Sequence, residues 1–334
     1  MRRLEMILSR LAWFVPTLAG LIAIVFLISN VIPTDPVRIM LGENATEEQI
    51  AAMRVKLGYD RPLAIQLVNH FRDVLSGNLG TSIYSQRPIS EDLATRVPAT
   101  LELALTAIVL AVLIGIPLGV VSALHRNSFL DQVVRLASVS GLAIAAFWLA
   151  MQLQFLFSMK MRVAPLNGRI DGFGPDRITG MMVLDSALAG DWESLGSALA
   201  HIALPAITLA LPAAATIVRF TRAGVLEVIN SNHVLYQRAM GMPPGLITWK
   251  YVLRNALIST VTQIGLIFGV LITNSVVVEA VFDWPGLGTF VVNSILQSDH
   301  KAIIGFTIWT GGLIVIVNLL VDIVHTMLDP RGAR

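Results

Sequence analysis

The chain of 334 residues is 55% apolar and only 14% charged, with a mean hydropathy of +0.72. Such a composition excludes an ordinary soluble domain and is typical of a protein that crosses a membrane several times. The formal net charge of +2 gives no support for nucleic-acid binding, and the absence of cysteine excludes disulfides, thiolate metal sites and thiol catalysis.

Six apolar runs are each long enough to cross a hydrocarbon core of about 30 Å, which takes roughly 20 helical residues. They lie at 11–32, 100–124, 136–158, 200–218, 257–281 and 303–327. None alternates apolar and polar residues, which disfavours a transmembrane barrel. The first run is too long for a signal peptide, and no small-x-small cleavage site follows it. We therefore predict an all-α polytopic membrane protein with about six transmembrane helices.

The segment 33–99, between the first two runs, has a helical pattern of its own. Thr46 and Gln49 form a capping box at the start of a helix that Gly58 ends. A second helix is predicted from Pro62 to Leu75. The residues expected to face inward are Ile50, Met53 and Leu57 in the first helix and Ile65, Val68 and Phe71 in the second. We interpret this segment as a small helical lid, with direct solute contact as the alternative.

Two pairs of glycines stand four residues apart inside the runs: Gly115 with Gly119, and Gly265 with Gly269. Glycines at this spacing remove side chains from one stripe of a helix, so that a second helix can approach closely. We predict that both pairs are helix-packing sites.

Polar groups within the runs are few. Glu102 and Glu279 lie near the ends of their runs, whereas Asn318 and Asp322 lie one turn apart on the last run. A carboxylate deep in the membrane costs about 2.5 kcal/mol or more, so it should face protein or water. We interpret Asn318 and Asp322 as hydrogen-bonding partners of a neighbouring helix, with a proton relay as the alternative.

A polar segment, Arg219 to Ala256, separates the fourth run from the fifth. It holds five basic residues and one acid, Glu227. Gly241 permits a turn that a bulky residue could not make without strain, and Pro243 to Gly245 should end one short helix before another begins near Leu246. Arg238 and Arg254 offer forked donors suited to a partner's carboxylates or helix-end carbonyls. Attachment to anionic lipid is the alternative.

The distribution of basic residues sets the expected orientation. If the N-terminus is inside, basic residues outnumber acidic ones in the inner segments 1–10, 125–135, 219–256 and 328–334. Acidic residues outnumber basic ones in the outer segments 33–99, 159–199 and 282–302. By the positive-inside rule both termini are expected in the cytoplasm.

Enzyme signatures are missing. The sequence contains no Walker-type phosphate loop, no His-Glu-x-x-His and no Gly-x-Ser-x-Gly. We therefore expect no catalytic residue, no metal and no cofactor bound by this chain.

Arg238-Ala239-x-Gly241, followed by Leu253-Arg254-Asn255-Ala256, resembles the inner-membrane permease subunits of bacterial ABC importers in the dipeptide, oligopeptide and nickel branch. The resemblance covers nearly the whole chain. It extends to Gly42–Thr46, Leu57–Leu63, Gly77–Ser82, Arg96–Leu103, Arg219–Arg222, Val278–Gly288, Asn318–Asp322 and Leu328–Arg331. Each piece is weak alone, but the ordered set is specific.

The resemblance implies a set of partners. In that family a cytoplasmic loop forms a coupling helix that docks on an ATPase subunit, and the matching residues here are Arg238, Ala239, Gly241, Arg254 and Asn255. The expected assembly contains a second homologous permease, two ATPase subunits that bind the ATP, and a periplasmic substrate-binding protein. The expected location is the bacterial inner membrane, and the expected solutes are short peptides or related small molecules.

The implied organisation follows the runs. Residues 1–32 form the N-terminus and first span, 33–99 a periplasmic insertion, 100–327 the permease domain with its coupling loop at 219–256, and 328–334 a cytoplasmic tail. We expect a tight turn, formed by Trp284, Pro285, Gly286 and Gly288, to help close the outer gate, with an ordinary interhelical loop as the alternative.

Two other functions remain possible from the sequence. A stand-alone proton-coupled carrier would use Asp322 and Glu279, and it would transport when reconstituted alone. A structural subunit of a respiratory complex is less attractive, because the chain shows no ligands for its cofactors.

Overall fold

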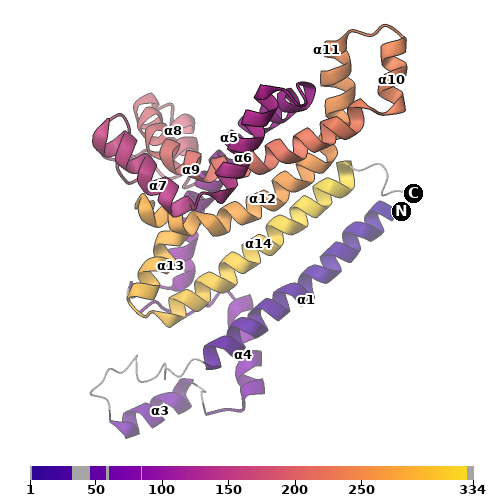
Figure 1. Cartoon of the computed structure of the whole chain (residues 1–334). Coiled ribbons are helices and arrows are strands. Elements are labelled where there is room, and N and C mark those ends of the chain that lie inside the picture. The colour runs from indigo at the N-terminus through magenta and orange to yellow at the C-terminus, as the bar shows by residue number, and fades with distance from the viewer. Residues whose placement is uncertain (1, 32–45, 58–59, 84, 329–334) are drawn as a thin grey trace. The chain divides into compact units, whose positions relative to one another are not determined.

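The computed structural model describes residues 2–31, 46–57, 60–83 and 85–328. These residues are largely helical, and their only β pairing is an isolated bridge between Thr81 and Pro88. The chain divides into two compact units. Figure 1 labels their helices in chain order. Arg96–Phe290 form the bulk of the larger unit together with the end of the last helix, whereas Ser9–Thr95 and Val291–Val315 form the smaller one.

Helix α9 (Trp192–Ile229) is the core of the larger unit. It packs against α6 (Phe129–Ala143), α7 (Ala146–Leu153), α8 (Met182–Ala189) and α12 (Leu253–Val281). In its most apolar stretch of 18 residues, 72% of the residues are buried. The corresponding share is 39% for α5 (Ile89–Leu124) and 33% for the helical span Pro244–Val281, which ends with α12. Small residues make this possible, because alanines at six buried positions let neighbours approach on several sides: Ala198, Ala206, Ala210, Ala213, Ala214 and Ala215.

The described residues of the six predicted runs are helical except for a break at Ile144 and Ala145, so the predicted all-α fold class is confirmed. Among the described residues, four helices are long and apolar enough to span a membrane, or five if a bent pair counts as one span. Helix α1 (Arg2–Val31) adds the shorter apolar segment Ala12–Ile28, and α14 (His300–Leu328) contains the last run.

The third run differs from the single straight span that we predicted. It is a pair of helices, α6 and α7, bent by 102°, and α7 continues as the π-helix η1 (Gln154–Lys160). Ile144 and Ala145, between the two helices, are extended. The bend contains no proline. The Gln154 amide, directly after α7, donates to the Leu166 and Val281 carbonyls, 2.8 and 3.3 Å away, and so holds the far end of α7.

The smaller unit contains the predicted capping box. The Gln49 backbone N–H donates to the Thr46 hydroxyl (3.3 Å), and the Thr46 N–H donates to the Gln49 side-chain oxygen (3.0 Å). The helix that follows is α3 (Glu47–Leu57), in which Ile50 is buried. Gly58, its expected end, lies outside the described residues.

Helix α4 (Leu63–Leu75) forms as predicted, but its inward face was wrong in part. Ile65 and Val68 are exposed, whereas Phe71 and Val74 pack against a buried cluster that includes Ile22. The half-buried face of α4 is turned by about one residue and includes His70, whose ring packs at a tilt against that of Phe26, with centroids 5.5 Å apart. A histidine gave no apolar signal in the sequence. Desolvation outweighs the nearby Asp73 carboxylate and lowers the pKa of His70.

The start of α14 is tied to the segment before α5. The Asp299 carboxylate accepts hydrogen bonds from the Ser82 hydroxyl (2.6 Å) and the Ile83 backbone N–H (2.8 Å), and it also accepts from the Ala302 N–H in the first turn of α14 (3.1 Å). This carboxylate therefore caps one helix and holds a distant loop, which orders the smaller unit.

Candidate functional site

The connection between α9 and α12 consists of three short helical pieces: α10 (Asn232–Ala239), α11 (Pro244–Leu246) and the π-helix η2 (Ile247–Val252). Gly241 has φ +73°, and its N–H donates to the Arg238 carbonyl at 3.0 Å, so the turn uses a left-handed residue directly after α10. The second helix begins at Pro244, slightly before the predicted start, because the fixed φ of proline suits the first helical position.

The inner face of this connection is a buried apolar cluster. Val234 of α10 and Val252 of η2 are fully buried together with Val120 of α5 and Val225 of α9. The cluster also contains Ala123, Ile247 and Ala256. These residues come from α5, α9, α10, η2 and α12. The connection is therefore packed against the ends of the three long helices α5, α9 and α12.

The outer face of the connection carries the residues that the sequence singled out. Arg238, Ala239, Gly241, Arg254 and Asn255 are all exposed. The Asn255 amide bonds only within its own helical turn, to the Tyr251 carbonyl at 2.8 Å. Five large apolar residues are exposed beside them: Leu235, Tyr236, Met240, Leu246 and Trp249.

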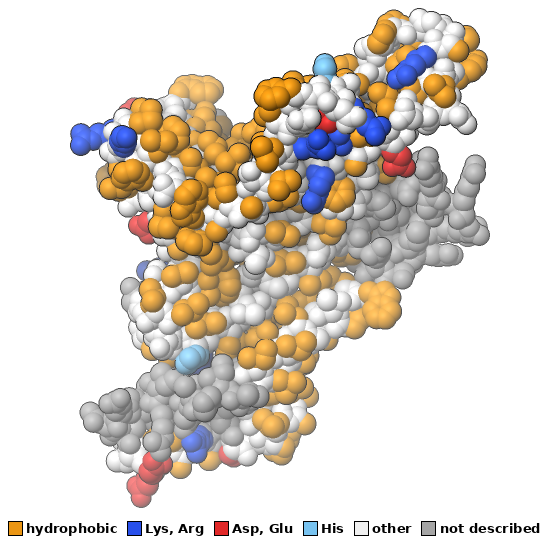
Figure 2. Space-filling view, viewed as in Figure 1, with side chains coloured by type: hydrophobic (Ala, Val, Ile, Leu, Met, Phe, Trp, Pro, Cys, Tyr) orange, Lys and Arg blue, Asp and Glu red, His pale blue; other side chains and the backbone are white. Residues whose placement is uncertain are grey.

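Figure 2 shows hydrophobic and basic side chains together at the tip formed by α10 and α11. Exposed apolar residues beside arginines are a combination that protein-binding surfaces often have. The arrangement can bind a partner and transmit its movement to the buried cluster beneath.

A buried ion pair lies at the same end of the larger unit. The Arg222 guanidinium of α9 donates to both carboxylate oxygens of Asp131, through Nε at 2.8 Å and Nη2 at 2.9 Å. Asp131 is fully buried and also accepts from the Ser122 hydroxyl (2.6 Å) and the Asn127 N–H (3.0 Å). It thus joins the end of α5, the start of α6 and α9. Asp131 was not predicted from the sequence, because an acidic residue in the first turn of a helix is common and gives no sign of a distant partner.

A second cluster surrounds the turn 282–288, which we call the Trp284 turn. Trp284 is 1% exposed, and its indole N–H donates to the Ala99 carbonyl of α5 at 2.9 Å. The Leu287 N–H donates to the Thr100 hydroxyl at 2.8 Å, which starts α13 (Leu287–Leu296). Pro285 is exposed, whereas Gly286 and Gly288 are buried. The turn is therefore largely buried and packs against α5, unlike a solvated loop.

Glu279 is enclosed by this turn. Its carboxylate is fully buried and accepts from the Gly288 N–H (2.6 Å) and the Ser275 hydroxyl (3.0 Å). A Cβ on Gly286 would collide with the Glu279 carboxylate, and a Cβ on Gly288 with the Val276 backbone. Both glycines are thus required by close approach, and Glu279 serves to organise the turn.

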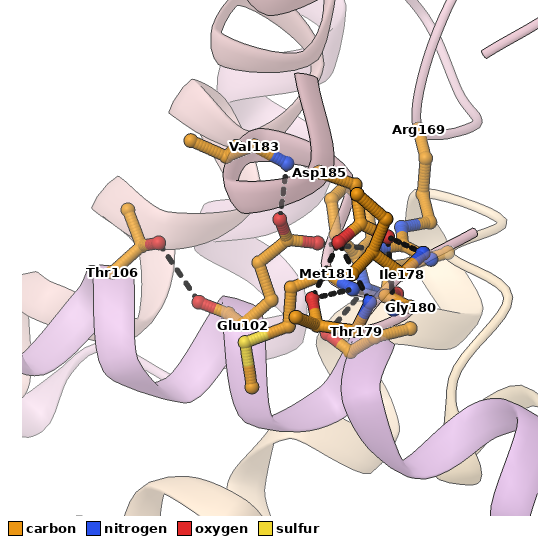
Figure 3. Close-up of polar contacts among 11 residues, drawn as sticks. Glu102, Thr106, Arg169, Ile178, Thr179, Gly180, Met181, Val183 and Asp185 are labelled. Atoms are coloured by element: carbon orange, nitrogen blue, oxygen red, sulfur yellow. Dashed lines mark hydrogen bonds and ion pairs between the residues drawn. The ribbon is translucent and has the colours of Figure 1, made fainter. Parts of the chain in front are cut away.

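Two further carboxylates organise the neighbouring loop (Figure 3). Glu102 of α5 pairs with the Arg169 guanidinium and accepts from the Val183 N–H at the start of α8 (2.6 Å). The Arg169 guanidinium also lies over the Trp284 ring, 5.3 Å from its centroid. Glu102 is thus connected through Arg169 to the Trp284 turn.

Asp185 of α8 folds back onto the loop before it. It accepts from the Thr179 hydroxyl (2.6 Å), the Thr179 N–H (2.8 Å) and the Gly180 N–H (2.9 Å). Burial alone would raise the pKa of Asp185, but these hydrogen bonds to the charged form outweigh it, so the pKa lies below its ordinary value.

The glycine pairs lie at close helix approaches. A Cβ on Gly115 would be 2.7 Å from Ile217 of α9, and a Cβ on Gly119 would be 2.7 Å from Thr221 of α9. Gly265 lies against Val321 of α14 with no room for a Cβ, whereas a Cβ on Gly269 would make an ordinary contact of 3.7 Å with Asn318. The Asn318 side chain is exposed, and that of Asp322 lies outside the described residues.

Two family descriptions match adjoining parts of the chain. Residues 115–334 match "Binding-protein-dependent transport system inner membrane component", and residues 3–104 match "Binding-prot-dependent transport system membrane comp, N-term". The chain belongs to this family. It is a membrane-spanning permease component of a binding-protein-dependent transport system, as the resemblance implied.

Relatives of the permease match it almost from end to end. It is 40% identical to the probable D,D-dipeptide transport system permease protein DdpB of Escherichia coli (strain K12) over 331 residues, 98% of this chain and 97% of the relative. It is 34% identical to the dipeptide transport system permease protein DppB of the same strain, with 98% of each chain covered. The same values hold for the glutathione transport system permease protein GsiC of Salmonella choleraesuis (strain SC-B67).

The fold of the permease has a solved counterpart. A chain of the inward-facing MetNI methionine ABC transporter superposes with a TM-score of 0.54 at 17% identity, covering 71% of this chain and 96% of that one. The relatives carry the names of transport proteins rather than enzymes. None of these comparisons supports the stand-alone carrier.

Proposed function

We propose that this permease is the membrane subunit of an ATP-driven importer of short peptides or closely related solutes. The observation that carries the proposal is the near full-length similarity to permeases named for dipeptides, D,D-dipeptides and glutathione. These solutes share peptide-type amide groups in a small molecule. The subunit works with a second homologous permease, two ATPase subunits and a periplasmic substrate-binding protein.

The α10–α12 connection is the contact for an ATPase in this proposal. Its exposed residues Arg238, Ala239, Gly241, Arg254 and Asn255 meet the partner, while its inner face is packed on α5, α9 and α12. A displacement of the connection is therefore passed to the long helices, because a close-packed cluster transmits strain and does not absorb it. ATP is bound and hydrolysed by the partner, and this chain contributes no catalytic residue, metal or cofactor.

The Trp284 turn, with Pro285, Gly286 and Gly288, helps to close the opposite end of the path. Its support is the burial of Trp284 and Glu279 and their contacts with Ala99 and the turn's own N–H groups. The proposal places the permease in the bacterial inner membrane with both termini and the α10–α12 connection in the cytoplasm. The Trp284 turn then faces the periplasm.

A Gly241→Trp substitution tests the coupling contact. Residue 241 needs a positive φ, and its surroundings are open, so a bulky side chain strains the turn and projects into the partner surface without disturbing the buried cluster. We expect the complex to assemble and ATP-driven uptake to fall by at least about tenfold. Gly196→Trp, at an exposed helical glycine of α9 with open surroundings, is the matched control.

Reconstitution separates the alternatives. Uptake of glutathione or alanyl-alanine into proteoliposomes should require ATP, both permeases, the ATPases and the binding protein. Full uptake by an assembled Gly241→Trp complex would contradict the coupling contact. Uptake by this chain alone, driven by a proton gradient, would contradict the importer itself.

A further inference from the structure

The outer half of α12, from Leu266 to Val281, has two distinct faces. The buried face consists of Gly269, Leu271, Ile272, Ser275, Val278 and Glu279. The exposed face consists of Leu266, Val270, Thr273, Asn274, Val277 and Ala280. These positions recur at helical spacing, so they form one continuous stripe, with two polar residues, Thr273 and Asn274, at its middle.

Helix α5 supplies an internal comparison. Between Thr100 and Leu124 its exposed residues are all apolar, and they include Leu105, Val109 and Leu113. Such a stripe is what a lipid-facing helix presents. Because the Trp284 indole bonds to Ala99, that level of α5 matches the end of α12. Leu105 of α5 and Asn274 of α12 are each about two turns from this level, and Val109 is one turn deeper. The two exposed faces therefore differ in polarity at similar depth.

The Asn274 amide has no hydrogen bond to any residue that the structure describes. Thr273, by contrast, can donate within its own helix, to the Gly269 carbonyl at 3.4 Å. A primary amide without a partner in hydrocarbon is strongly unfavourable, so this position must face water or a polar molecule. The exposed stripe of α12 is therefore unsuited to contact with lipid at Asn274, whereas the exposed stripe of α5 is suited to such contact at a similar depth.

Helix α7 packs beside α12 and exposes a similar mixture. Phe147, Trp148 and Met151 are each between 44% and 49% exposed. Gln152 is exposed next to them, and its amide also lacks a hydrogen-bond partner within the described part of the chain. The neighbouring helices α7 and α12 therefore both expose a side-chain amide without a hydrogen-bond partner among the described residues. On α7 this amide lies beside exposed aromatic and thioether side chains.

We propose that Asn274 and Gln152 line the path of the transported solute and form its polar contacts with peptide groups. This rests on the proposed function. A side-chain amide both donates and accepts, as a peptide group does, so each can replace water around a passing peptide bond. Aromatic and methionine side chains adapt to varied solute side chains. The exposed stripe of α12 from Leu266 to Ala280 carries no charge, so a solute is not held too tightly to leave.

Cysteine accessibility provides the test, because the natural chain has no cysteine. Asn274→Cys and Gln152→Cys are compared with Val109→Cys and Leu113→Cys, each in the complete complex in lipid nanodiscs. The probe is a membrane-impermeant, negatively charged methanethiosulfonate, and modification is read from the mass of this chain. Only a hydrated thiol ionises and reacts, so we expect labelling at 274 and 152 to be at least about tenfold faster than at 109 and 113.

Two further results are expected if the path is lined here. The labelling rate at 274 should change by several-fold between the nucleotide-free complex and the complex trapped with ATP and vanadate. Asn274→Asp should lower uptake of alanyl-aspartate relative to alanyl-lysine by at least about threefold, because a negative charge in the path repels the acidic peptide. A structural asparagine would alter both peptides equally.

The outcomes are separable. Labelling at 274 as slow as at 109, in a complex that still performs ATP-driven uptake, overturns the path assignment and leaves the importer intact. Fast labelling at 274 that is the same in both nucleotide states, with unchanged peptide preference, also overturns it. Loss of ATP-driven uptake in the unmodified complex with every peptide would instead count against the proposed function.

Discussion

Replacing Asp131 with Asn removes one charge from the buried pair that joins α5, α6 and α9. The carboxylate accepts four hydrogen bonds at 2.6–3.0 Å, two of them from the Arg222 guanidinium. Asparagine keeps the shape, but each carboxylate oxygen accepts two of these bonds, so the NH₂ group that replaces one oxygen faces two donors, one of them from Arg222. The variant therefore loses at least one charge-assisted bond and leaves Arg222 with an uncompensated charge.

The size of the effect follows from burial. Removing one partner of a buried ion pair costs about 3–5 kcal/mol. Asp131 is fully buried but the Arg222 side chain is 19% exposed, so water can partly solvate the remaining charge. We expect the free energy of unfolding to fall by about 3 kcal/mol, near the lower end of that range. Reversible denaturation of the purified chain in detergent micelles, followed by far-ultraviolet circular dichroism, measures it.

Arg135 provides a matched control on the same carboxylate. Its Nε lies 3.9 Å from Asp131, and its side chain is 53% exposed. Arg135→Ala should cost about 0.5 kcal/mol or less, as is usual for an exposed pair. Combining Asp131→Asn with Arg222→Met should cost at least about 2 kcal/mol less than the sum of the single changes. A loss below about 0.5 kcal/mol for Asp131→Asn, or equal losses for Asp131→Asn and Arg135→Ala, would refute the reasoning.

Two other predictions concern packing and the loop before α8. Gly119→Ala should lower the free energy of unfolding by about 1–3 kcal/mol, since its Cβ would lie 2.7 Å from Thr221. Gly196→Ala, in open space, should not destabilise the protein. Equal melting temperatures of the two variants would contradict the close approach at Gly119. For Asp185 the folded pKa is depressed, so its stabilising charge is fully present above the ordinary value of 3.8 and is lost as pH falls through the folded pKa. The backbone N–H groups of residues 178–181 should therefore stay protected from hydrogen exchange between pH 7 and pH 5 and lose protection only in stronger acid. Asp185→Asn should reduce this protection already at pH 7. Unchanged protection in this variant would show that other contacts hold the loop.

The sequence predicted features that arise from local rules. Thr46 and Gln49 specify a capping box because both partners lie within one turn, and the structure confirms it. Six apolar runs specify helices because a membrane-spanning segment must satisfy its own backbone. The left-handed turn at Gly241 was also foreseen, since glycine adopts a positive φ without strain.

Features that depend on distant partners could not be predicted in this way. The bend between α6 and α7 lies in a largely apolar run without proline, and the far end of α7 is held by bonds from Gln154 to the distant Leu166 and Val281. The inward face of α4 was misplaced because His70 packs on Phe26 of another helix. In each case the sequence near the feature is compatible with either arrangement.

The sequence by itself therefore determined that this protein is a helical, multi-spanning membrane permease with a basic connection between its fourth and fifth runs. Only the tertiary structure decided which polar residues are satisfied internally and which are not. Asp131 finds Arg222 at a separation of 91 residues, whereas Asn274 finds no partner within the described chain. The physical reason is that apolar periodicity depends on residues that are close in the sequence. The pairing of a buried charge or amide depends on helices that are distant in the sequence and meet only in the folded protein.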